Sequence, residues 1–280
     1  GFKLILLRTE TMSAVENIVG KIMESSSDRE ATRQALVNMA RLSECSERYE
    51  DMCVFMRQLV LFLCEGSQPL TTEERNLLSV AYKNVIGTRR ASWRFFSTME
   101  DQQDETLTVY SSQIQKELFD ICHNILSLLE DHLLKNPDEK DDAKVFFLKM
   151  TADYYRYLCE PAQGDSEKIE SAQNQANKYY KEAHESAQQL KPTNPIRLGL
   201  ALNYSVFYFE ILKDKNNACK LAKTAFDEAI SKLDKLQESD YKDSTLIMQL
   251  LRDNLTLWTS GEGDGGDEVT VEDFSDDEAA

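Results

Sequence analysis

A near-absence of helix-breaking residues constrains this chain more than any other feature of its sequence. The 280 residues include only ten Gly and five Pro, and four of the Gly lie in the last twenty positions. Gly and Pro are the residues that most destabilise a helix interior. Apolar residues recur at helical spacing along almost all of the remaining chain. The sequence therefore predicts an all-α fold.

Helix-start signals divide the chain into segments. They are two capping boxes and two Asn-Pro pairs: Ser27 with Glu30, Thr71 with Glu74, Asn136 with Pro137, and Asn194 with Pro195. We therefore expect helices near residues 13–24, 28–45, 48–65, 72–99, 104–135, 137–160, 165–190, 195–212, 216–234 and 240–259. The short connections between them favour antiparallel neighbours.

The segments differ in composition, which predicts three parts. Residues 1–30 form an extension with a short amphipathic helix, whose apolar residues recur at helical spacing: Ala14, Val15, Ile18, Val19, Ile22 and Met23. Residues 31–260 form the helical domain. Residues 261–280 hold nine acidic residues and no Lys or Arg. Their low apolar content cannot support a core, so we expect a flexible acidic tail.

Charge and cysteine usage exclude several kinds of partner and compartment. A net charge of −17 does not favour binding to nucleic acid or anionic membranes, which requires a basic surface. The six Cys form no C-x-x-C pair, so we expect reduced thiols packed as small apolar residues. No run reaches the roughly twenty apolar residues of a membrane helix, and residues 4–7 are too short for a signal peptide's apolar region. A cytoplasmic protein is expected.

Two expected helices carry basic stripes. On the helix near 72–99, Lys83, Gly87, Arg90 and Arg94 share one face, and the Gly would let a ligand approach closely. On the helix near 137–160, Lys149, Asp153 and Arg156 share a face with Tyr157 beside it. A guanidinium next to a phenol suits a phosphate, since both donate hydrogen bonds.

Two further helices carry apolar stripes that each contain an Asn. Their members are Gly199, Asn203, Val206 and Glu210 near 195–212, and Ile247, Leu250, Asn254, Leu257 and Trp258 near 240–259. Each of the four stripes also fits a simpler interpretation: a solvated face, an ion-pair ladder, a helix–helix hydrogen bond or ordinary core. Together they favour an amphipathic groove, in which the Asn side chains hold an extended peptide backbone. Spacing leaves open whether the four faces converge.

No enzymatic site is expected. The chain has three His, His123, His132 and His184, and it lacks a nucleophile elbow, a P-loop, an H-E-x-x-H motif and an EF-hand loop. The sequence therefore predicts a protein with no catalytic residues, no metal and no cofactor.

Four long runs resemble 14-3-3 proteins, and together they span roughly residues 35–260. They are residues 75–85 (RNLLSVAYKNV) with 89–94 (RRASWR), 153–158 (DYYRYL), 195–203 (PIRLGLALN) and 241–258 (YKDSTLIMQLLRDNLTLW). The resemblance implies nine antiparallel helices that form a cup-shaped groove, a dimer, and binding of phosphoserine or phosphothreonine in extended peptides. The expected N-terminal helix is extra.

The resemblance and the stripes together assign site residues. The phosphate pocket falls on Lys83, Arg90, Arg156 and Tyr157. Peptide-binding positions are Lys149, Gly199, Leu202, Asn203, Val206, Glu210, Ile247, Leu250, Asn254, Leu257 and Trp258. The dimer interface falls on Leu42, Ser46, Arg48, Asp51, Ser92, Phe96, Met99, Tyr110 and Glu117.

The implied dimer interface departs from the family pattern. Ser46 stands in place of a usual Ala, Phe96 in place of a smaller aliphatic residue, and Gln113 where a Lys often pairs with Asp51. Arg48 and Glu117 keep one ion pair between protomers. We expect a homodimer or heterodimer with altered contacts, and we expect the N-terminal helix to pack near them.

The predicted function is a phosphopeptide-binding adaptor that regulates client proteins through the groove of a dimer. The alternative is a helical scaffold that binds unmodified peptides. A lipid- or nucleotide-handling enzyme is a third possibility, for which no catalytic base is visible. We also hypothesise that the acidic tail binds the protein's own groove, with Thr270 and Ser275 as candidate phosphorylation sites in acidic surroundings.

Overall fold

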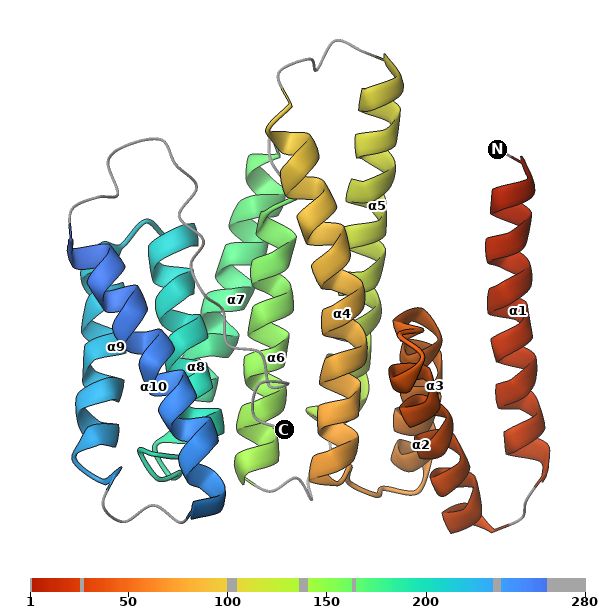
Figure 1. Ribbon diagram of the computed structural model, residues 1–280, viewed down its shortest axis with the longest axis horizontal. Coiled ribbons are helices and arrows are strands. Elements are labelled where there is room, and N and C mark those ends of the chain that lie inside the picture. Colours follow the sequence, from red (N-terminus) through yellow and green to blue (C-terminus); the bar gives the residue numbers. More distant parts are fainter. Residues whose placement is uncertain are drawn as a thin grey trace. The chain divides into compact units, whose positions relative to one another are not determined.

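The computed structural model describes residues 2–25, 28–99, 105–135, 141–162, 165–233 and 238–260. These residues form ten α-helices and two π-helical turns and contain no strand (Figure 1). The all-α prediction is confirmed. Within the described part, no helix is long and apolar enough to cross a membrane.

The chain divides into two compact units, Gly1–Asp138 and Glu139–Ala280. The first contains α1 (Phe2–Ser25), α2 (Arg29–Cys45), α3 (Tyr49–Glu65), α4 (Thr72–Ser97), α5 (Glu105–Leu128) and η1 (Leu129–Leu133). The second contains α6 (Asp141–Cys159), α7 (Ser166–Ala187), α8 (Pro195–Val206), η2 (Phe207–Ile211), α9 (Lys215–Ile230) and α10 (Glu238–Thr259). In the first unit α1 contacts α2 and α3, and α3 and α5 both pack against α4. In the second, α6 packs along α7, and α8, α9 and α10 pack on one another.

Local capping explains where two helices begin. The Thr71 hydroxyl accepts a hydrogen bond from Glu74 N (3.2 Å), and the Glu74 carboxylate accepts one from Thr71 N (2.7 Å). Asn194 accepts from two backbone amides at the start of α8. Both predicted caps are confirmed. The predicted cap at Ser27 is wrong, because Asp28 is the N-cap of α2 and its carboxylate accepts from Glu30 N at 3.0 Å. Ser27 and the Asn136–Pro137 pair lie outside the described residues.

Two expected helix ends differ from simple α-helix. The helix near 195–212 changes to a π turn at Phe207, where Leu212 N donates to Phe207 O (3.1 Å). The helix near 104–135 does the same at Leu129. A π turn accommodates an extra residue in the helix and occurs frequently at functional sites. The N-terminal helix also begins at Phe2 rather than near residue 13, because no Gly or Pro interrupts the residues between.

The core of the second unit lies among α8, α9 and α10. Leu198, Leu202 and Val206 from α8 pack with Ile247, Leu251 and Trp258 from α10. The fully buried residues that α9 contributes to this core are three Ala, at positions 218, 222 and 229, and Phe226 packs against the core partly buried. Small side chains on α9 allow close helix packing.

The six cysteines are all free thiols. Cys122 and Cys159 are buried, and burial raises the pKa of Cys159 to about 12, which keeps its thiol neutral. The prediction that the cysteines pack as small apolar residues holds for these two. It is wrong for Cys45, which is exposed at the last position of α2.

Candidate functional site

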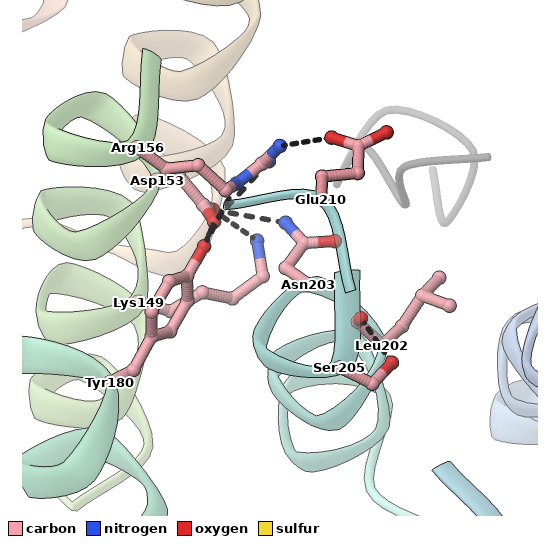
Figure 2. Close-up of polar contacts among 8 residues, drawn as sticks. All are labelled: Lys149, Asp153, Arg156, Tyr180, Leu202, Asn203, Ser205 and Glu210. Carbon is pink, nitrogen blue, oxygen red and sulfur yellow. Dashed lines mark hydrogen bonds and ion pairs between the residues drawn. The ribbon is translucent and has the colours of Figure 1, made fainter. Parts of the chain in front are cut away.

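Asp153 on α6 is the centre of a buried polar cluster in the second unit (Figure 2). Its carboxylate accepts hydrogen bonds from Lys149 Nζ at 3.2 Å, from Asn203 Nδ2 at 3.0 Å, and from the Tyr180 hydroxyl. Lys149 is one helical turn before Asp153 and therefore lies on the same face of α6. Tyr180 comes from α7 and Asn203 from α8. One carboxylate thus joins three helices.

Arg156 lies on the same face of α6 and is fully buried. Its Nε donates to the Tyr180 hydroxyl at 3.2 Å, and its terminal nitrogens lie 3.8 Å from Asp153 and 4.0 Å from Glu210. The guanidinium carbon is 4.8 Å from the centre of the Tyr157 ring. Glu210 belongs to the π turn η2. Two cations and two carboxylates therefore meet in a region largely shielded from water, where charge interactions are strong.

The amide of Asn203 has a defined orientation in this cluster. An ionised carboxylate can only accept hydrogen bonds, so the amide NH₂ must face Asp153. The side-chain oxygen then points elsewhere, as Figure 2 shows. Within the described part of the chain, no group donates a hydrogen bond to this buried oxygen. Leaving a buried acceptor without a donor is costly, so Asn203 Oδ1 is suited to accept an N–H from a ligand.

Trp258 Nε1 on α10 is a second buried polar atom with no partner among the described residues. The indole stacks on Phe209 with ring centres 4.8 Å apart. Trp258 offers a donor and Asn203 offers an acceptor. A peptide backbone can supply the complement of each.

Most of the predicted peptide-binding residues of α8 and α10 are buried. Leu202, Val206, Ile247, Leu250 and Trp258 belong to the core cluster described above, and Leu257 packs against it partly buried. Gly199 and Asn254 are also buried. These positions contribute to the helix packing of the second unit, and their contact with a peptide stays a prediction.

Sequence reasoning missed Tyr180. Its hydroxyl bonds both Asp153 and Arg156, and its ring stacks on Tyr204 at 5.0 Å. One signal could have identified it. The buried stripe of α7 consists of Ala172, Ala176, Ala183 and Ala187 apart from this Tyr. A single phenol among buried alanines indicates a hydroxyl that is held by a specific partner.

The first unit carries the other two predicted phosphate ligands. Lys83 and Arg90 lie on α4, partly buried, with the exposed Gly87 between them. A Cβ added at Gly87 would meet no described atom within 4 Å, so packing does not require glycine there. The joint action of Lys83 and Arg90 with Arg156 and Tyr157 stays a prediction.

The predicted dimer residues lie on α2, α3, α4, α5 and the turns beside them. Leu42 is 61% exposed and Tyr110 56%, and Ser46 and Ser92 are exposed as well. Within the chain, Arg48 pairs with Asp51 at 2.5 Å and Glu117 with Arg89 at 3.3 Å. The expected ion pair between Arg48 of one protomer and Glu117 of another stays a prediction.

Comparison with known proteins identifies the relatives of this chain. The family model described as 14-3-3 protein matches residues 39–259, which include α3–α10 and the C-terminal part of α2. The chain belongs to the 14-3-3 family. It is 52% identical over 250 residues to a 14-3-3-like protein F of Nicotiana tabacum, covering 86% of this chain and 96% of the relative. It is 53% identical over 246 residues to a 14-3-3 protein 2 of Solanum lycopersicum, covering 85% and 95%.

This membership confirms the resemblance seen in the four sequence runs. 14-3-3 proteins are adaptors that bind phosphoserine and phosphothreonine motifs, not enzymes. Within the described residues, no group of three or more His, Cys, Asp or Glu side chains could hold a metal ion.

Proposed function

We propose that this 14-3-3 protein is a dimeric adaptor that binds phosphoserine- or phosphothreonine-containing segments of client proteins and thereby regulates the clients. The observation that carries the proposal is the cluster around Asp153. It holds two buried cations, Lys149 and Arg156, beside an amide whose oxygen has no donor among the described residues. Family membership supplies the class of ligand.

The cluster supports recognition of a phosphate together with a peptide backbone. A guanidinium presents several N–H donors in a planar fork, which matches the oxygens of a phosphate. Asp153 and Tyr180 hold the Arg156 side chain in position before a ligand arrives, so little conformational entropy is lost on binding. Asn203 would then accept a backbone N–H next to the phosphorylated residue.

The proposal assigns the remaining predicted residues as follows. Tyr157 contributes its hydroxyl to the phosphate, and Lys83 and Arg90 contribute further positive charge. Asn254 binds the peptide backbone as Asn203 does. The dimer presents two such sites, so a client with two phosphorylated segments gains affinity through effective concentration.

The test is a calorimetric titration with matched pairs of serine peptides that differ only in the phosphate. Each charge-assisted hydrogen bond contributes about 1.5–3 kcal/mol, so loss of the phosphate should weaken binding by at least about tenfold. Equal affinity for both peptides would contradict the proposal and support a scaffold for unmodified peptides. Failure of both peptides to bind at millimolar concentration would contradict either function.

A further inference from the structure

The N-terminal helix α1 lies wholly outside the segment that matches the family model, which begins at residue 39. It nevertheless belongs to the first unit, where it contacts α2 and α3. Val15 and Val19 are 5% and 8% exposed. Burial of two β-branched apolar side chains, one turn apart, is the packing expected of an amphipathic helix that places its apolar face against neighbouring helices. This addition therefore changes the surface of α2.

An open depression of about 280 Å³ lies between α1 and the α2–α3 pair. Ala14, Val15 and Ile18 line it from α1, and Met39, Leu42 and Ser46 line it from α2 and its C-terminal cap. Ser43, Arg48, Asp51 and Phe55 complete the lining. We call this depression the α1–α2 socket. Two of its apolar side chains remain exposed to solvent, Ile18 at 38% and Leu42 at 61%. A helix that merely covered the α2 surface would bury Leu42. Because Leu42 stays exposed, α1 instead forms one side of the depression beside α2.

A second apolar feature of the same unit lies on α4 and α5. Phe95, Phe96 and Tyr110 form a row of edge-to-face rings, with centres 5.5 Å and 5.1 Å apart. We call this row the α4–α5 aromatic cluster. Phe95 is 61% exposed and Tyr110 56%, and the neighbouring Val109 is 65% exposed. Exposed apolar groups gathered in this way mark an interaction surface.

We propose that α1 extends the dimer interface that the family resemblance implies for α2, α4 and α5, and that Ile18 on the α1 wall of the α1–α2 socket of one copy contacts an aromatic side chain of the α4–α5 aromatic cluster of a second copy. The inference rests on the dimer in the proposed function and assigns to it a helix outside the family match. An enclosed cavity of about 150 Å³ can hold benzene, so the socket has room for a ring. Socket and cluster belong to one chain, and a twofold dimer can therefore form this contact twice.

Sedimentation of the full chain over a range of micromolar concentrations tests the inference. Ile18→Glu places a charge in the socket wall, and Phe95→Glu places one in the aromatic cluster. Burying an unpaired charge in an apolar interface is unfavourable, so each variant should weaken dimerisation by about tenfold or more. The matched control is Asn17→Glu, which adds the same charge at an exposed position of α1 that does not line the socket. The control should dimerise as the wild type does, and circular dichroism should show the same helix content in all four proteins.

The outcomes separate this inference from the proposed function. If the wild type dimerises and Ile18→Glu dimerises equally well, α1 has no part in the interface and the inference is wrong, while the dimer stands. If the wild type is monomeric, the dimer itself is contradicted. If Ile18→Glu then forms dimers, α1 covers the dimer surface rather than extending it, which also overturns the inference. Affinity of the groove for one singly phosphorylated peptide should be unchanged in every variant.

Discussion

At the scale of single residues, Asn203 separates backbone recognition from phosphate recognition. Its Nδ2 is held by Asp153, and its oxygen is the acceptor proposed for a peptide N–H. We expect Asn203→Ala to remove about one hydrogen bond, near 1 kcal/mol, and so to weaken peptide binding by roughly fivefold. Calorimetry should find the same factor for phosphorylated and unphosphorylated peptides. A loss confined to the phosphorylated peptide would contradict the backbone role.

Arg156 is expected to show the opposite pattern. Arg156→Lys keeps the positive charge but loses the planar fork of donors and the bond to Tyr180. Affinity for the phosphorylated peptide should fall by at least about tenfold, whereas affinity for the unphosphorylated peptide should hardly change. Lys83→Glu, at a partly buried position of α4, should likewise lower the affinity for the phosphorylated peptide relative to the affinity for the unphosphorylated one. Unchanged phosphopeptide affinity in both variants, with normal melting temperatures, would overturn the phosphate assignment.

Helical spacing was sufficient to place Lys149, Asp153 and Arg156 on one face of α6, because their separations of three and four residues are local. It could not place Tyr180 or Asn203 against Asp153. These residues are 27 and 50 positions away from Asp153, and their approach depends on how α7 and α8 pack. Nor could spacing predict the orientation of the Asn203 amide, which is set by the carboxylate that it faces.

At the scale of helices, the pair of Arg33 and Glu74 joins α2 to α4. The carboxylate of Glu74 accepts two N–H groups of Arg33, at 2.7 Å and 2.6 Å, and also closes the capping box with Thr71. Burial raises the pKa of Glu74, but the hydrogen bonds from Arg33 and Thr71 outweigh it and the net shift is downward. We expect Glu74→Gln to lower the free energy of unfolding at neutral pH by about 2–3 kcal/mol.

The pH dependence of that loss is determined by the direction of the shift. Because the folded pKa lies below the unfolded value of about 4.3, the stabilisation is complete above pH 4.3 and is lost as the pH falls through the folded pKa. Denaturant titrations should therefore show the difference between wild type and Glu74→Gln shrinking below about pH 4. Glu73→Gln is the matched control. Its carboxylate pairs with Arg41 on the surface, where ion pairs contribute about 0–1 kcal/mol.

Helix boundaries were predictable where a side chain caps the helix and unpredictable where packing decides. Thr71 and Asn194 bond amides two or three residues ahead, so a short sequence window contains the whole interaction. The π turn at Phe207–Ile211 has no such local signature. It nevertheless determines where Glu210 lies, at 4.0 Å from Arg156.

At the scale of the whole molecule, the family and the all-α fold followed from the sequence, since both depend on long motifs and on a pattern that extends along the chain. The burial of the apolar stripes of α8 and α10 could not be predicted from the sequence. An apolar stripe broken by an Asn has the same spacing whether it lines a groove or a core, and Ile247 and Leu250 lie in the core.

The acidic tail, residues 261–280, should weaken phosphopeptide binding by competing for the cations of the proposed peptide-binding groove. It carries nine acidic residues and begins three positions after Trp258, in the same unit as Lys149 and Arg156. We expect a chain that ends at Ser260 to bind a phosphopeptide more tightly at low salt, with the gain shrinking as salt screens the charges. A full-length control with the nine acids changed to Asn or Gln should bind like the truncated chain if charge is the cause.

Phosphorylation of Thr270 or Ser275 adds about −1.5 to −2 charge and should strengthen the competition of the tail with the phosphopeptide. Equal affinities of the full-length, truncated and neutralised chains at low salt, with and without phosphorylation, would show that the tail does not reach the groove.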